Sequence, residues 1–116
     1  MKRNMELIRL ELLQVEGEHP KPDFEGFTEE QQVYHMALCI EAGLVDGTII
    51  PNGSGYPVAT AAIRLTWKGH EFLDAARNDT IWKKALGNIK KAGVQVTLPL
   101  LEEVLKKAAK ELLGLP

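Results

Sequence analysis

The stretch GLVDGTIIPNGSGYPVATAAIRLTWKGHEFL, residues 43–73, decides the fold of this chain. Two of its segments, Val45–Ile50 and Val58–Leu65, are rich in β-branched and small apolar residues, and the turn-forming residues 51–57 lie between them. This pattern predicts a β-hairpin. Because successive side chains of a strand point to opposite faces, three residues of the second strand are expected to face the core: Ala61, Ile63 and Leu65.

Two helices are predicted before the hairpin. Apolar residues recur at helical spacing over 2–16 and again over 28–42. Thr28 and Gln31 form the sequence pattern of a capping box, which marks the start of the second helix. The residues between the helices include an extended-looking segment, and a short strand is predicted there over 24–27.

Three helices are predicted after the hairpin, over 66–78, 80–93 and 98–113. Large aromatic side chains contribute most to the stability of a fold when they are buried. Three are therefore expected in the core: Trp67, Phe72 and Trp82. The apolar face of the last helix is wide for a terminal element. It either folds back on the rest of the chain or pairs with a second copy, so a homodimer through 98–113 is one of two alternatives.

The end of the second helix, the hairpin and the start of the third helix resemble the second half of a winged helix. In that family a recognition helix closes on an Ala-Gly-Leu turn, as in Glu41–Val45, and the hairpin is the wing. A Leu-Thr-x-x-Gly segment then begins the next helix, as in residues 65–69. The resemblance implies an α+β, winged-helix-like fold with a C-terminal helical extension. Residues 1–78 would form the winged-helix-like core and 79–116 the extension, in one compact unit.

A second resemblance is to a family of small bacterial and phage proteins that share a domain of unknown function. It rests on the start Met-Lys-Arg-x-Met-x-Leu-Ile-Arg, residues 1–9, and on the motif Leu-Thr-Trp-x-Gly-His-Glu-Phe-Leu-Asp, residues 65–74. This resemblance covers nearly the full chain. It implies a fold but no catalytic residues, and no enzymatic activity is expected.

The spacing between the first two helices departs from the usual winged helix. That family has two helices before the recognition helix, joined by a tight turn. Here the eleven residues Gly17–Phe27, with two prolines, separate the first helix from Thr28. The middle helix is therefore expected to be missing or reduced to one turn.

Composition excludes several classes of protein. The chain has 116 residues, of which 45% are hydrophobic and 26% charged, as in an ordinary globular domain. No apolar run is long enough for a membrane span, and the N-terminus turns polar too soon for a secretory signal, so a cytoplasmic protein is expected. His35 and Cys39 have the spacing of two metal ligands, but no further Cys or His cluster completes a site. Neither a metal nor a cofactor is expected.

Charge is unevenly distributed along the chain. Residues 1–50 hold four Lys or Arg and ten Asp or Glu, whereas residues 51–116 hold ten and six. No Lys or Arg lies between Lys21 and Arg64, a range that includes the predicted recognition helix and wing. Because cations supply most nucleic-acid affinity, this interval disfavours DNA binding through those elements.

Two hypotheses on function follow. The first is a small regulatory or adaptor module that binds another protein through the helix 28–42 or the apolar last helix. The candidate interaction residues of the former are Glu29, Glu30, Tyr34 and Glu41. The alternative is a DNA-binding, transcriptional-regulator-like protein that uses the lysine-rich helix 80–93, where four lysines occur without an acidic residue: Lys83, Lys84, Lys90 and Lys91.

Overall fold

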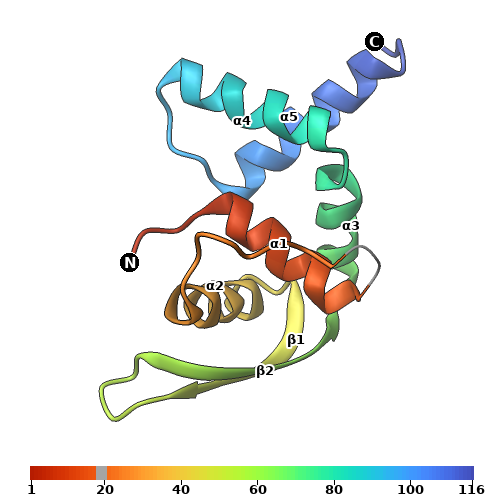
Figure 1. Ribbon diagram of the computed structural model, residues 1–116. Helices are drawn as coiled ribbons and strands as arrows, with labels where there is room; N and C mark the ends of the chain where they lie inside the picture. The colour runs from red at the N-terminus through yellow and green to blue at the C-terminus, as the bar shows by residue number, and fades with distance from the viewer. Residues whose placement is uncertain (18–20) are drawn as a thin grey trace. The chain divides into compact units, whose positions relative to one another are not determined.

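The structure is a computed structural model that describes residues 1–17 and 21–116. Its contacts divide the chain into two compact units, Met1–Glu71 and Phe72–Pro116, which are described separately below. The elements in chain order are α1 (Met5–Glu16), α2 (Glu29–Glu41), β1 (Val45–Pro51), β2 (Pro57–Leu65), α3 (Trp67–Ala76), α4 (Asp79–Ala92) and α5 (Leu98–Leu112) (Figure 1). The predicted α+β class is confirmed, and the order of helices and hairpin is compatible with a winged-helix-like arrangement.

The core of the first unit lies where α1 packs on α2 and the hairpin. The residues that fill it are Leu7, Ile8, Leu12, Met36, Ala37, Cys39, Leu44, Val45 and Leu65. The capping box at α2 is confirmed, because the Thr28 Oγ1 accepts the Gln31 N–H at 3.1 Å and the Gln31 Oε1 accepts the Thr28 N–H at 2.8 Å. In the view of Figure 1 the hairpin runs beneath α2, and its loop extends past that helix.

The hairpin contains two irregularities that change which side chains are buried. Asp46 pairs with Arg64 and Gly47 pairs with Ala62, so Ile63 is an extra residue on β2. Such a bulge interrupts the alternation of a strand. The prediction that Ile63 faces the core is therefore wrong: its side chain is 74% exposed. Ala61 is exposed as well, and only Leu65 of that set is buried.

The short strand predicted over 24–27 is also wrong, because these residues form a turn. The Phe27 N–H donates to the Phe24 carbonyl at 3.0 Å, and Gly26 has φ 89°, which a strand does not tolerate. The sequence predicts that the middle helix is missing or reduced to one turn within the eleven residues Gly17–Phe27. Residues 18–20 of this segment lie outside the described residues. The described remainder, Gly17 and residues 21–27, contains no helix.

The segment Leu65–Gly69 ties the start of α3 to the end of α2. The Thr66 N–H donates to the Leu44 carbonyl at 3.0 Å, and the Thr66 hydroxyl donates to the Gly43 carbonyl at 2.5 Å. The same hydroxyl accepts the Gly69 N–H at 3.0 Å and so caps α3. A Cβ at Gly69 would overlap the Leu44 carbonyl oxygen. The Leu-Thr-x-x-Gly motif therefore joins the end of α2 to the start of α3 through hydrogen bonds and a close backbone contact.

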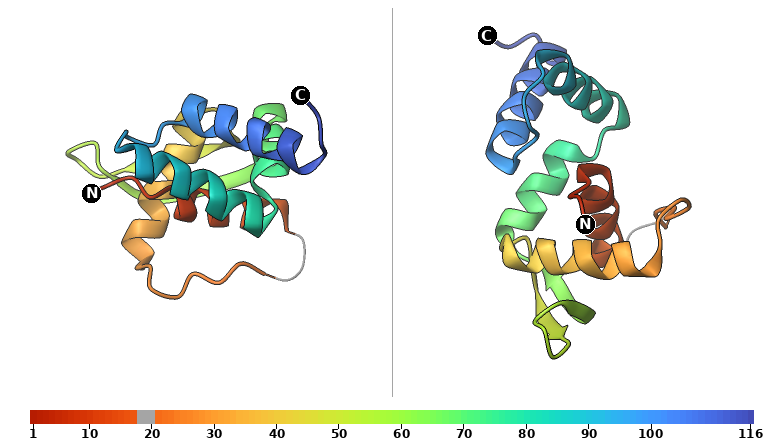
Figure 2. Two further views of the ribbon diagram at one scale, coloured as in Figure 1. Left: turned by 90° about the horizontal axis from the view of Figure 1, so that it is seen from above. Right: turned by 90° about the vertical axis from the view of Figure 1, so that its left-hand side faces the viewer.

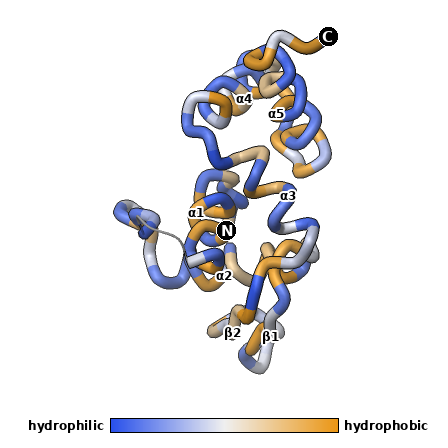
Figure 3. The backbone as a smooth tube through the Cα atoms, turned by 90° about the vertical axis from the view of Figure 1, so that its right-hand side faces the viewer, coloured by the Kyte–Doolittle hydropathy of each residue, from blue (hydrophilic) through white to orange (hydrophobic). Residues whose placement is uncertain are grey.

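In the second unit α5 packs on α4 (Figure 2). The buried residues of the two helices are Trp82, Ala85, Ile89, Leu101, Leu105 and Ala108. Both helices alternate hydrophobic and hydrophilic residues along the backbone (Figure 3), as amphipathic helices do. Phe72 packs edge-to-face on Trp82 with ring centroids 6.4 Å apart, and both are buried as predicted.

Trp67 does not join this core, and the prediction that it does is wrong. The side chain lies in the first turn of α3 and is 80% exposed. Its indole N–H donates to the Glu71 carboxylate one turn further along the helix. Helical spacing predicts on which face of a helix an aromatic residue lies. Whether that face is buried depends on which other elements pack against it.

Candidate functional site

The four acidic and aromatic candidates on α2 occupy its outer surface. Glu29, Glu30 and Glu41 are exposed, and Tyr34 is half-buried. The helical period places Glu30, Tyr34 and Glu41 on one stripe, and Glu29 lies in the first turn about 100° around the helix from Glu30. None of the three carboxylates forms an ion pair with a cation among the described residues. The stripe therefore presents carboxylates without ion pairs, and one ammonium lies near its C-terminal end, where the Lys68 Nζ donates to the Ala42 carbonyl at 3.3 Å.

Tyr34 also stacks on Tyr56, which immediately precedes β2. The ring centroids are 5.8 Å apart and the ring planes are inclined by 25°. These are the two tyrosines of the chain. The stack connects the α2 stripe to the wing, and the two elements together form one surface.

Tyr56 is held in place by the hairpin loop. The Asn52 Oδ1 accepts the N–H groups of Ser54 at 2.9 Å and of Tyr56 at 3.0 Å. The Asn52 N–H donates to the Tyr56 carbonyl at 2.8 Å, and the Gly55 N–H donates to the Asn52 carbonyl at 3.0 Å. One asparagine thus fixes the loop and the backbone of Tyr56.

The charge of Glu30 acts on the tyrosine stack. Partial desolvation raises the pKa of the Tyr56 phenol, and the charges of Glu30 and Tyr34 raise it further. Glu30 therefore lies close enough to the stack for its charge to act on the ring. We call the surface formed by Glu29, Glu30, Tyr34, Glu41 and Tyr56 the acidic–aromatic face.

His35 is a structural residue of the first unit. The side chain is buried, and it is not part of the outer surface of α2. Its Nε2 accepts the Asn4 N–H at 2.8 Å, and its Nδ1–H donates to the Gln31 carbonyl at 2.8 Å. Burial lowers the pKa of this imidazole. His35 joins the start of α1 to α2, and the helical periodicity alone did not show that contact.

The second candidate for metal ligation, Cys39, is buried in the core as well. Desolvation, and secondarily the charge of Glu11, raise the pKa of its thiol. Within residues 1–17 and 21–116, no three His, Cys, Asp or Glu side chains cluster as metal ligands do. His35 and Cys39 are used for packing and hydrogen bonding between helices.

The four candidate nucleic-acid lysines are all exposed on α4. Lys84, Lys90 and Lys91 line a shallow depression together with Gly87 and Asn88. The Lys84 Nζ lies 3.4 Å from the Glu111 Oε2, so α5 brings a carboxylate beside the lysine row. The acid-free sequence 80–93 therefore does not correspond to an acid-free surface.

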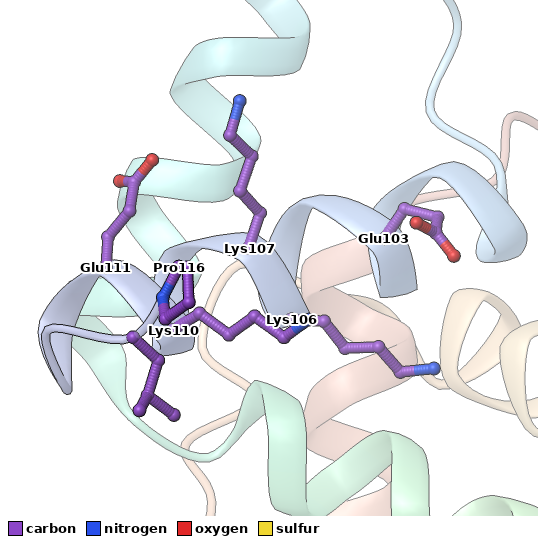
Figure 4. A pocket seen from close by; sticks show the side chains of 7 residues that line it. Glu103, Lys106, Lys107, Lys110, Glu111 and Pro116 are labelled. Carbon is purple, nitrogen blue, oxygen red and sulfur yellow. The ribbon is translucent and has the colours of Figure 1, made fainter.

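A second depression lies along α5. Its lining is of mixed charge and comprises Glu103, Lys106, Lys107, Lys110, Glu111, Leu115 and Pro116. Lys106 and Lys107 extend in different directions from the helix (Figure 4), so the cations do not converge on a common point. Beyond the helix–helix packing, Leu112, Leu113 and Leu115 are exposed. Leu112 is the last residue of α5, and the other two follow it.

Fold and surface together define a small winged-helix-like α+β protein with an acidic–aromatic face and a separate lysine-bearing helix. The chain belongs to the family described as hypothetical protein (DUF2513), whose model matches residues 2–95. An uncharacterized protein of Haemophilus influenzae is 36% identical over 120 residues, which cover 98% of this chain and 100% of the relative. No solved structure matches.

This membership confirms the resemblance to a family with a domain of unknown function. The match includes both motifs on which that resemblance rests, the N-terminal segment from residue 2 and the Leu-Thr-Trp-x-Gly motif at 65–74. Among the described residues, no helix is both long and apolar enough to cross a membrane.

Proposed function

We propose that this protein is a small regulatory or adaptor module without enzymatic activity, which binds a basic protein partner through the acidic–aromatic face. One observation carries the proposal. The outer surface of α2 and the wing holds unpaired carboxylates and a tyrosine stack, and no Lys or Arg occurs from Pro22 to Ile63.

The charge of this surface favours protein over nucleic acid. Glu29 and Glu30 in the first turn of α2 would face phosphate oxygens if the helix entered a DNA groove, and like charges would repel. The same carboxylates attract a basic protein surface and speed its association. The imbalance extends over the whole first unit, because residues 1–71 hold six Lys or Arg and eleven Asp or Glu.

The wing adds apolar surface next to the charged stripe. Ile50 and Val58 are both exposed, and Val58 is the extra residue at the second bulge of the hairpin. Protein interfaces combine an apolar and aromatic centre with a polar rim. Tyr34, Tyr56 and the exposed wing residues match the first component, and the three glutamates match the second.

Charge reversal tests the proposal. We expect that Glu29→Lys, Glu30→Lys and Glu41→Lys together abolish capture of a protein partner from a native cell extract, since each change replaces attraction by repulsion. Capture is measured with the immobilised full chain, followed by mass spectrometry. The control is Glu102→Lys, Glu103→Lys and Glu111→Lys on α5, which changes the net charge equally. Partners that resist the α2 reversal, or that disappear only with the α5 reversal, would contradict the proposal.

The alternative function is DNA binding through α4, and the exposure of all four lysines favours it. It predicts binding to random-sequence duplex DNA at about 50 mM salt that weakens steeply at about 200 mM. Alanine at Lys83, Lys84, Lys90 and Lys91 would then lower the salt slope by up to about 0.9 for each phosphate that is no longer neutralised. Fluorescence anisotropy measures both quantities. The proposed protein-binding function predicts no saturable binding at the lower salt concentration.

A further inference from the structure

The tyrosine stack beside Glu30 resembles a recognition element more than a packing contact. Both rings are half-buried, so the pair keeps exposed aromatic surface in contact with solvent. Glu30 is exposed and precedes Tyr34 by one helical turn. An aromatic face beside an unpaired carboxylate offers two different attractions to the same ligand group.

We propose that the Tyr34–Tyr56 stack and the Glu30 carboxylate bind an arginine side chain of the partner. This inference rests on the proposed function and names the chemical group that the acidic–aromatic face selects. A guanidinium is planar and permanently charged, stacks on an aromatic face and donates two parallel hydrogen bonds to a carboxylate. Lysine lacks both the plane and the fork, and it is more strongly hydrated.

The surroundings leave this site open to an arginine from outside the chain. The interval from Pro22 to Ile63 supplies no cation of its own, and Arg64, which follows it, pairs with Asp46 at 2.6 Å. An anionic ligand would meet Glu30 and Glu41 on the same stripe and be repelled. The charge of the face therefore excludes phosphate and carboxylate ligands and favours a cation.

The site is also organised before binding. Asn52 fixes the loop through two side-chain and two backbone hydrogen bonds, which hold the Tyr56 backbone, and the Tyr56 ring stacks on Tyr34. The capping box fixes the first turn of α2, where Glu30 lies. A ligand that meets a preformed site spends less of its interaction energy on ordering it.

The two tyrosines provide a direct probe. In the full chain labelled with [13C]tyrosine, every labelled ring signal reports the stack, because both tyrosines belong to it. We expect the synthetic peptide Ac-Gly-Arg-Gly-Arg-Gly-amide to shift these signals saturably. The lysine analogue is expected to bind several-fold more weakly, and the uncharged citrulline analogue is expected to leave the signals unchanged.

Variants separate the two halves of the site. Glu30→Gln is expected to lower the association constant of the arginine peptide by about 2- to 5-fold, as is Tyr56→Leu, which leaves the Tyr34 ring as a probe. Glu103→Gln on α5 is the matched control and should change nothing. The absence of a saturable shift with the arginine peptide would overturn the inference, as would equal shifts with citrulline.

The peptide titration and the charge-reversal experiment can fail independently of each other. If reversal of the α2 glutamates abolishes partner capture while the arginine peptide produces no ring shift, the face binds its partner without an arginine site. If the arginine peptide binds and the charge reversal leaves capture unchanged, the proposed function fails although the site exists.

Discussion

Replacing Gly69 with alanine is expected to lower the free energy of unfolding by about 3 kcal/mol. Gly69 is buried in the first turn of α3, where the carbonyl of Leu44 approaches the helix so closely that a Cβ would overlap its oxygen. That carbonyl is not free to move, because it accepts the Thr66 N–H. The higher helix propensity of alanine, about 1 kcal/mol, offsets only part of this cost.

Gly87 provides the matched control. It lies in the interior of α4, and a Cβ at this position has nothing within 4 Å. Gly87→Ala is therefore expected to raise the free energy of unfolding by up to about 1 kcal/mol. Urea unfolding followed by circular dichroism measures both variants. Equal effects of the same sign at the two positions would show that the contact between Gly69 and the Leu44 carbonyl does not require glycine.

Glu11→Gln is expected to stabilise the protein by about 2–3 kcal/mol at pH 8 and by almost nothing at pH 4.5. Glu11 lies in α1 with only 4% of its surface exposed, and its Oε1 has no hydrogen-bond partner among the described residues. Burial raises the pKa of this carboxyl from 4.5 to about 7. The folded state therefore holds the proton more tightly than the unfolded state does.

The sign of the pH dependence follows from that difference. Below about pH 4.5 the carboxyl is protonated in both states, and the penalty is absent. As the pH rises from 4.5 to about 7, only the unfolded state releases the proton freely, and the folded state becomes less stable. The nearby Cys39 thiol adds no charge in this range, because its own pKa is raised. Glutamine keeps the shape of the protonated side chain and removes the penalty.

The measurement is the difference in unfolding free energy between the wild-type protein and Glu11→Gln, from urea unfolding at several pH values. His35 has a lowered pKa and destabilises the folded state as the pH falls, in the opposite sense. It is present in both proteins, so its contribution cancels in the difference. A difference independent of pH, or a less stable variant at pH 8, would contradict a buried protonated Glu11.

Much of the fold follows from local sequence signals. The capping box at Thr28 and Gln31 depends only on neighbouring residues, and the sequence predicts it. Ile63 does not follow the prediction because its exposure results from the register between two strands. A bulge appears only when both strands are paired, and periodicity within one strand does not reveal it.

The candidate site was predictable to a similar extent. The glutamates and Tyr34 follow from the polar face of α2 and the missing cations, which are properties of the sequence alone. Tyr56 does not, because its stacking on Tyr34 joins a loop to a helix that are distant in sequence. Its one signal is an aromatic residue among turn-forming residues, next to Asn52, whose side chain can organise a turn.

A basic partner that binds the acidic–aromatic face must bring cationic side chains against Glu29, Glu30 and Glu41, and its lysines are expected at the glutamates other than Glu30. Carbodiimide joins a carboxylate to a lysine amine only where the two groups touch, so cross-linking the full chain in its native cell extract tests this contact directly. We expect mass spectrometry to find partner lysines joined to Glu29 or Glu41, because the arginine expected at Glu30 carries no amine that carbodiimide can join. Links confined to α5 carboxylates such as Glu103, or partner acids joined to Lys83, Lys84, Lys90 and Lys91, would contradict the proposed function.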